Sequence, residues 1–375
     1  MSENRNVFED VGEKKPEATA AKKPKAQGRG AISFWLGLIF VLLVVMIAVG
    51  GLTRLTDSGL SITEWKPITG AIPPLSAADW ATEFGKYQAS PEFMLQNSAM
   101  TLAEFKGIFW WEWGHRFLGR FIGLVWAVGF FWFWLRRQIP TGYAKRFLGL
   151  GVLGGLQGAL GWWMVSSGLT GRMVDVASYR LAMHLGLAFV ILGLITWYVL
   201  SIRMTGADLL QARRRREGGL MRFSTVLIAL LFIQILLGGL VAGIDAGEGY
   251  PTWPSMDGQF LPSGSFEFTP LWSNFFENVA LVQFNHRMMG YVVFLAGAVL
   301  WWKSRKSPVA ATRHAYLVMM VMMLAQVALG VFAVITSVQF LVAISHQLGA
   351  VVLFALAVRA RFAAAYPADQ KIARG

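Results

Sequence analysis

Eight long apolar segments constrain this chain more than any other feature of its sequence. They span residues 32–52, 117–135, 147–166, 181–201, 223–243, 281–302, 315–336 and 340–358. Each is close to the roughly 20 residues that a bilayer-spanning helix needs, and 55% of the 375 residues are hydrophobic while only 15% are charged. We therefore predict an all-α integral membrane protein with eight transmembrane helices, and the composition excludes a string of soluble domains.

The basic residues gather on one side of the predicted membrane. The segments on that side are the tail 1–31, the turns 136–146, 203–222 and 303–313, and the end 359–375. Together they hold 25 of the 34 Lys and Arg residues, which is the asymmetry of cytoplasmic loops. Both termini are therefore expected on the cytoplasmic side of a cell inner membrane. We interpret the arginine run 213–216 as a topology anchor or a contact with anionic membrane lipids, because no nucleic-acid-binding motif accompanies the net charge of +13.

The first four predicted helices and the last four share a sequence pattern. The matched segments are Glu112-Trp-Gly-His115-Arg116 with Gln283-Phe-Asn-His286-Arg287, Gln157-Gly-Ala-Leu-Gly161 with Gln326-Val-Ala-Leu-Gly330, and His184-Leu-Gly186 with His346-Gln-Leu-Gly349. We predict two pseudo-symmetric four-helix bundles, 32–202 and 223–358, related by an axis along the membrane normal. A basic cytoplasmic linker at 203–222 joins them. Residues 1–31 are expected to form a disordered basic cytoplasmic tail, and 359–375 a second cytoplasmic tail.

Four of the five histidines occupy matched positions of this repeat, and the fifth, His314, lies in a basic inner turn. Each of the four is expected within the first turns of its helix from the outer face, and therefore at one depth. A haem iron takes two axial nitrogens from opposite sides, and facing helices of a bundle can each supply one imidazole. The chain has no cysteine, so thiolate ligands are excluded. We predict two bis-histidine haem sites, pairing His115 with His184 and His286 with His346.

The two halves differ beside the histidines. Glu112 lies three residues before His115, on the same helix face, whereas the repeat places Gln283 at the matching position. A carboxylate can take or deliver protons during an oxidation, and an amide cannot titrate. Arg116 and Arg287 each follow a predicted ligand directly, and their guanidinium groups are expected to pair with haem propionates.

Four segments together resemble one known family, that of the haem A synthases, over nearly all of residues 32–358. They are Glu64-Trp-Lys-Pro-Ile-Thr-Gly-Ala-Ile-Pro-Pro74, Glu112-x-x-His115-Arg116, Tyr250-Pro-Thr-Trp-Pro-Ser-Met-Asp-Gly258 and Asn285-His286-Arg287. The resemblance implies an oxidoreductase that oxidises one ring methyl of haem O to a formyl group, giving haem A for cytochrome oxidase assembly. Many members carry a cysteine pair in the first outer loop; this chain has none and resembles the cysteine-free class of alphaproteobacteria and mitochondria, which leaves its electron route open.

The resemblance also implies roles for individual residues. His286 and His346 would ligate haem b, the cofactor held by the second half in that family. His115 and His184 would face the substrate haem O in the first half. Glu112 matches the glutamate that is regarded as essential to the reaction. The implied partners are haem O itself, a haem O synthase that hands it over, membrane lipids and an unidentified electron-transfer protein, and a homo-oligomer remains open.

Two alternatives use the same residues differently. A non-catalytic dihaem b electron carrier in the membrane would also need four histidines in register. It gives no reason for Glu112 to lack a counterpart or for the two long outer loops, 53–110 and 244–279, to differ. A transporter built on repeats would be expected to show broken helices and charges at the membrane midplane, and the sequence shows neither.

Overall fold

The protein is described here by a computed structural model that covers residues 28–171 and 173–368. Within these residues the chain is helical and forms no β-strand. The long helices are α1 (Arg29–Leu55), α4 (Leu102–Leu135), α5 (Ala144–Gly168), α6 (Ser178–Ile202), α8 (Gly218–Gly243), α10 (Val279–Ser304), α11 (Ala310–Ile335) and α12 (Phe340–Ala365). The short ones are η1 (Thr69–Ala71), α2 (Ala77–Gln88), α3 (Pro91–Leu95), α7 (Gly206–Arg214), η2 (Ser263–Phe266), η3 (Leu271–Ser273) and α9 (Asn274–Glu277).

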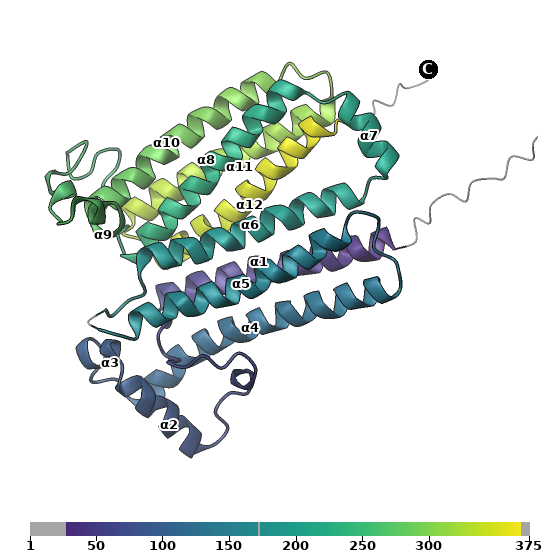
Figure 1. The fold of residues 1–375 in the computed structure, drawn as a ribbon. Helices are drawn as coiled ribbons and strands as arrows, with labels where there is room; N and C mark the ends of the chain where they lie inside the picture. The colour runs from purple at the N-terminus through teal and green to yellow at the C-terminus, as the bar shows by residue number, and fades with distance from the viewer. Residues whose placement is uncertain (1–27, 172, 369–375) are drawn as a thin grey trace, which may run out of the picture.

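The long helices run side by side, with α2, α3 and α9 at one end of the molecule and α7 at the other (Figure 1). Seven of them are long and apolar enough to cross a membrane: α1, α4, α5, α6, α8, α11 and α12. The remaining long helix, α10, has 26 residues, as α8 does, and carries Asn285, His286 and Arg287 in its outer part. The prediction of an all-α, multi-pass membrane protein is confirmed.

The packing order of the helices repeats along the chain. Helix α1 packs against α4 and α6 in the first half, as α8 packs against α10 and α12 in the second. Helix α5 packs against α6, as α11 packs against α12. The halves meet where α6 contacts α8 and α12, and Phe189 and Phe354 are in edge contact there with ring centroids 5.5 Å apart. Both rings are buried in the main apolar core, so the two halves share one core.

Helix α4 differs from its prediction because it begins well outside the apolar segment. It has 34 residues and starts at Leu102, with a capping box in which the Thr101 side chain and Glu104 satisfy each other's backbone N–H groups. The added outer turns bury Phe105 and Phe109 against α2 and α3. His115 therefore lies in the fourth turn of its helix, and the expectation that it falls within the first turns was wrong.

The predicted connecting segments contain helix as well. The linker 203–222 includes α7, whose N-cap Thr205 accepts from the backbone N–H of Asp208, and the arginine run 213–216 at its end is exposed. Helix α12 continues past 358 to Ala365, and α1 already begins at Arg29. Residues 1–27, most of the first predicted tail, and 369–375, the end of the second, lie outside the described residues.

Candidate functional site

The four matched histidines lie on α4, α6, α10 and α12, and each of the four side chains is partly buried. The rings of His286 and His346 are neighbours, with centroids 6.5 Å apart and planes nearly perpendicular at 82°. Two imidazoles on opposite sides of one metal ion, each with a metal–nitrogen bond of about 2 Å, have ring centroids about 6 Å apart. The separation of this pair would therefore suit two histidine ligands of one haem iron. In the first half, His184 lies close enough to His115 for their charges to interact.

A glycine on the neighbouring helix makes room for each of these rings. A Cβ atom added at the glycine would come within 2.9 to 3.1 Å of the ring Cε1 atom in all four cases. The pairs are Gly50 with His115, Gly161 with His184, Gly238 with His286, and Gly330 with His346. These distances are shorter than almost all contacts of real Cβ atoms, so a larger residue at any of the four glycines would require the imidazole to shift. Four copies of one cradle show that the repeat preserves the position of the histidine ring.

Three of the four histidines also touch a glutamine side chain. The Nε2 atom of Gln157 donates to the backbone carbonyl of His184 at 2.9 Å and lies 3.3 Å from its Nδ1 atom. Gln234 contacts His286 in the same way, at 3.1 and 3.2 Å. Gln326 contacts His346 at 2.9 and 3.2 Å. Such an outer partner fixes the orientation of a ligating imidazole, so these glutamines belong to the site.

The Glu112 carboxylate is held in a closed hydrogen-bond arrangement. One oxygen accepts from the Ser61 hydroxyl and from the backbone N–H of Ile62, both at 2.7 Å. The other accepts from the Arg116 guanidinium at 2.6 Å. The side chain is only 3% exposed. The first outer loop thus fixes this carboxylate on the same helix as His115, one turn away.

Arg116 and Arg287 bind the backbone of the two outer loops. Arg116 donates to the carbonyls of Ile62 and Glu64, and its guanidinium lies over the ring of Trp162. Arg287 donates to the carbonyls of Tyr250 and Thr252 at 2.7 and 2.8 Å, and its Nε atom is buried without a partner.

The outer loops close over the two halves in related ways. The Gln283 amide nitrogen donates to the carbonyls of Gly247 and Tyr250 at 3.2 and 3.4 Å, and its amide oxygen is buried without a partner. Glu112 and Gln283 therefore both anchor an outer loop, but only Glu112 has a side chain that can be ionised.

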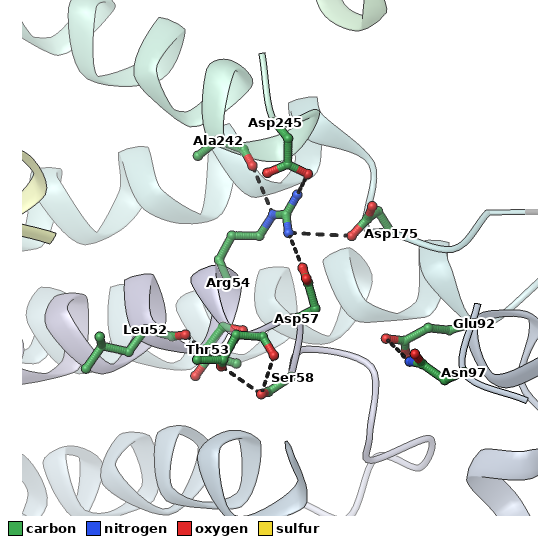
Figure 2. A network of polar contacts seen from close by, with 11 residues as sticks. Leu52, Thr53, Arg54, Asp57, Ser58, Glu92, Asn97, Asp175, Ala242 and Asp245 are labelled. Carbon is green, nitrogen blue, oxygen red and sulfur yellow. Dashed lines mark hydrogen bonds and ion pairs between the residues drawn. The ribbon is translucent and has the colours of Figure 1, made fainter. Parts of the chain in front are cut away.

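Arg54 joins the outer ends of the two halves (Figure 2). It donates to Asp57 at 2.7 Å, to Asp245 at 2.5 Å and to the carbonyl of Ala242 at 2.9 Å, and Asp175 lies 3.7 Å away. By the register of the repeat, Asp57 and Asp245 are equivalent residues, and both have left-handed backbone conformations with φ of 45° and 50°. The Arg54 guanidinium is therefore engaged by carboxylates of both halves.

A second buried carboxyl group lies in the cap formed by α2 and α3. Glu92 is 3% exposed, one of its oxygens accepts from the Asn97 amide at 3.5 Å, and the other is buried without a partner. Burial raises the pKa of Glu92 to about 8, and the negative charge of Glu112 acts in the same direction. The hydrophobic wall of the cap, with Tyr87 stacked on Phe105, keeps water away from this group. Glu92 is therefore neutral at moderate pH.

Replacing Glu92 with glutamine should flatten the dependence of stability on pH. The pKa of Glu92 lies above its ordinary value of 4.5, so the folded protein holds this proton more tightly than the unfolded chain. The resulting stability is complete at low pH and is lost as the pH rises from about 4.5 through about 8. Glutamine mimics the neutral acid and should raise the Tm of the detergent-solubilised protein by a few degrees at pH 9, with little change at pH 5. Parallel Tm curves for wild type and Glu92→Gln would contradict this; Glu248→Gln, at an exposed position, is the control.

Sequence reasoning found some parts of the site and missed others. It identified the four histidines, Glu112 and the two arginines. It missed the roles of the glutamines and of Glu92. The pattern Gln-x-x-x-Gly in α5, α8 and α11, visible as Gln157 with Gly161, was a usable signal for the glutamines. Nothing in the sequence around Glu92 indicated burial. His314 is exposed at the start of α11, apart from the other histidines.

The fold and the site together define a multi-pass helical membrane protein with two halves, each built around two histidines on facing helices. The sequence profile of cytochrome oxidase assembly proteins, COX15-CtaA, matches residues 33–358, and the chain belongs to this family. It is 57% identical to a haem A synthase of Dinoroseobacter shibae, over 98% of this chain and 97% of that protein. It is 54% identical to a haem A synthase of Paracoccus denitrificans, over 98% of each chain. The resemblance inferred from the sequence is confirmed.

Proposed function

We propose that this protein is a haem A synthase, an oxidoreductase that converts haem O into haem A by oxidising one ring methyl to a formyl group. The observation that carries the proposal is its similarity to curated haem A synthases over nearly the whole chain, at 57% and 54% identity. The paired histidines of the site supply the imidazole ligands that a haem needs.

We assign the two halves to two different haems. His286 and His346, at 6.5 Å between ring centroids, would hold haem b in the second half. His115 and His184 would hold the iron of haem O in the first half. The unpartnered Nε atom of Arg287 is a donor that a propionate could use, and Arg116 would take the same role in the first half. Haem b bound at its site supplies a one-electron redox centre within the membrane.

Glu112 is the residue that we assign to proton transfer. Hydroxylation of a methyl group and loss of water both require protons to move at the new oxygen atom. The Glu112 carboxylate is held rigidly by Ser61 and Ile62, and a fixed carboxylate can accept or return a proton at one place. Its ion pair with Arg116 keeps it in position. The matching Gln283 in the second half cannot do this, which agrees with a cofactor role for that half.

The surroundings of the protein follow from its charge pattern. The excess of Lys and Arg at the end of the bundle that carries α7 supports our proposal that this end faces the cytoplasm across the cell inner membrane. The site then lies toward the outer face. Haem O is hydrophobic, so a haem O synthase in the same membrane is the natural supplier. We propose an electron-transfer protein as a further partner, and the cysteine-free chain leaves the electron route open.

Extraction of the haems tests this proposal against its main alternative. The protein is purified from cells that also make haem O, and its haems are separated by chromatography. We expect haem b together with haem O, hydroxylated intermediates or haem A. Two haem b per chain, with no derivative haem although haem O is abundant, would instead identify a dihaem electron carrier. Protein from cells that lack haem O is the matched control and should contain haem b alone.

A further inference from the structure

One of the four histidine sites lacks the glutamine that the other three have. His184, His286 and His346 each accept from a glutamine amide nitrogen through their backbone carbonyl, and this nitrogen lies 3.2 to 3.3 Å from their Nδ1 atom. In His184 and His286 it also lies 3.4 and 3.3 Å from the Nε2 atom. His115 has no such glutamine: its Nδ1 atom is buried and has no hydrogen-bond partner. His115 is therefore the one imidazole of the four whose Nδ1 atom has no glutamine beside it.

Met46 occupies the position of the missing glutamine. Met46 lies four residues before Gly50 on α1, as Gln234 lies four residues before Gly238 on α8. The methyl group of Met46 would lie 3.0 Å from a Cβ atom at Gly119, and the amide nitrogen of Gln234 would lie 3.5 Å from a Cβ atom at the equivalent Gly290. The two side chains therefore fill the same space beside the histidine-bearing helix.

The exchange of an amide for a thioether changes what the neighbouring imidazole can do. An imidazole that binds a metal through Nε2 carries a proton on Nδ1, and an acceptor for this proton fixes the ring and strengthens the ligand. The Gln157, Gln234 and Gln326 side chains each have an amide oxygen that is buried without a partner. Rotation of the amide could turn this oxygen toward the Nδ1–H group. A thioether sulfur is only a weak acceptor, so Met46 offers His115 no comparable support.

We propose that His115 is the histidine of the first half that releases the haem iron when the substrate exchanges. Met46 weakens this ligand because its side chain gives the imidazole no hydrogen-bond support. In the second half both histidines are supported by glutamine, as suits a haem that stays. In the first half His184 is supported by Gln157 while His115 is not, as suits a haem that must bind, react and leave. This inference rests on the proposed function, because only a substrate haem needs to exchange. It places the exchangeable ligand one helical turn from Glu112.

The test is to give His115 the missing partner. Full-length wild-type protein and Met46→Gln, loaded with haem O, are mixed with excess apomyoglobin, which captures released haem. Haem O and haem b remaining in the protein are then separated by chromatography over time. Loss of an outer-shell partner changes metal affinity by about 10- to 100-fold. We therefore expect the Met46→Gln variant to release haem O at least about 10-fold more slowly, while its rate of haem b loss stays unchanged.

Matched variants separate this inference from general effects on the fold. Met46→Leu fills the same space without an amide and should behave as wild type. Gln157→Met should speed the loss of haem O, and Gln326→Met should speed the loss of haem b. Retention of haem b in Met46→Gln shows that the variant is folded.

Two results would overturn the inference. In the first, Met46→Gln releases haem O at the wild-type rate although Gln326→Met speeds haem b loss, which would show that the support matters but His115 does not control exchange. In the second, none of the glutamine variants changes any rate. If extracts contain only haem b, the proposed function fails before this comparison begins, and the two failures are therefore distinguishable.

Discussion

Replacing Glu112 with glutamine should lower haem A formation by about 10²- to 10⁴-fold and leave haem b bound. Glutamine is nearly isosteric, and its amide oxygen can still accept from Ser61 and from the N–H of Ile62, which both donate to one carboxylate oxygen in the structure. The substitution gives the first half the residue type that the second half has at Gln283. Glu112→Gln removes only the carboxyl group, which can accept and release a proton. The measurement is the ratio of haem A to haem O, by chromatography, in protein from cells that make haem O.

Controls must separate proton transfer from loop anchoring. Ser61→Ala removes one hydrogen bond to Glu112 but keeps the carboxylate, so it should retain most of the activity. Gln283→Ala removes the matching loop anchor in the second half and should retain activity as well. Full conversion by Glu112→Gln would refute the catalytic assignment. An equally large loss in Ser61→Ala would show that Glu112 acts only by holding the first outer loop.

Replacing His286 or His346 with alanine should reduce haem b to near zero in the purified protein. We propose that the two rings, with centroids 6.5 Å apart, hold one haem, so a variant without one of them would have a single protein ligand left for the iron. Haem A formation should stop with the loss of haem b. The measurement is the haem b content per chain, from the absorption spectrum and from extraction.

The other histidines provide the comparison. His115→Ala and His184→Ala should keep haem b and lose haem O and haem A. His314→Ala, at an exposed position near the inner end of α11, should keep both haems. If His286→Ala kept haem b while His184→Ala lost it, the assignment of cofactor and substrate to the two halves would be reversed.

The membrane character and the repeat could be predicted because both are encoded residue by residue. Insertion into a bilayer depends on the apolar content of each segment. The long helices could therefore be predicted from the hydrophobicity of successive stretches of about 20 residues. A tandem repeat keeps its residues in order, so His115 and His286 could be matched by their offset alone. The same comparison exposed Glu112, since it stands opposite Gln283. These features need no knowledge of how the helices face one another.

The extent of α4 and the burial of Glu92 could not be predicted in the same way. The outer turns of α4 are stabilised by aromatic contacts with α2 and α3, such as the edge contact of Trp80 with Phe109. These contacts join α2 and α3 to the start of α4. The hydropathy of these segments does not by itself predict that they fold together as a cap. Glu92 is buried because this cap closes over it, and nothing in its neighbouring sequence differs from an exposed loop.

The class of the protein, its repeat and the residue types of the candidate site could all be predicted from the amino-acid sequence. Which side chains meet across helices became clear only from the packed structure. Gln157 reaches His184 on the next helix, and Arg54 reaches Asp245, 191 residues away. The Met46 side chain takes the place of Gln234 beside the equivalent helix, which the residue type alone does not indicate. The physical reason is that a helix fixes the spacing of its own side chains, whereas the rotation and register of one helix against another are set by close packing of both.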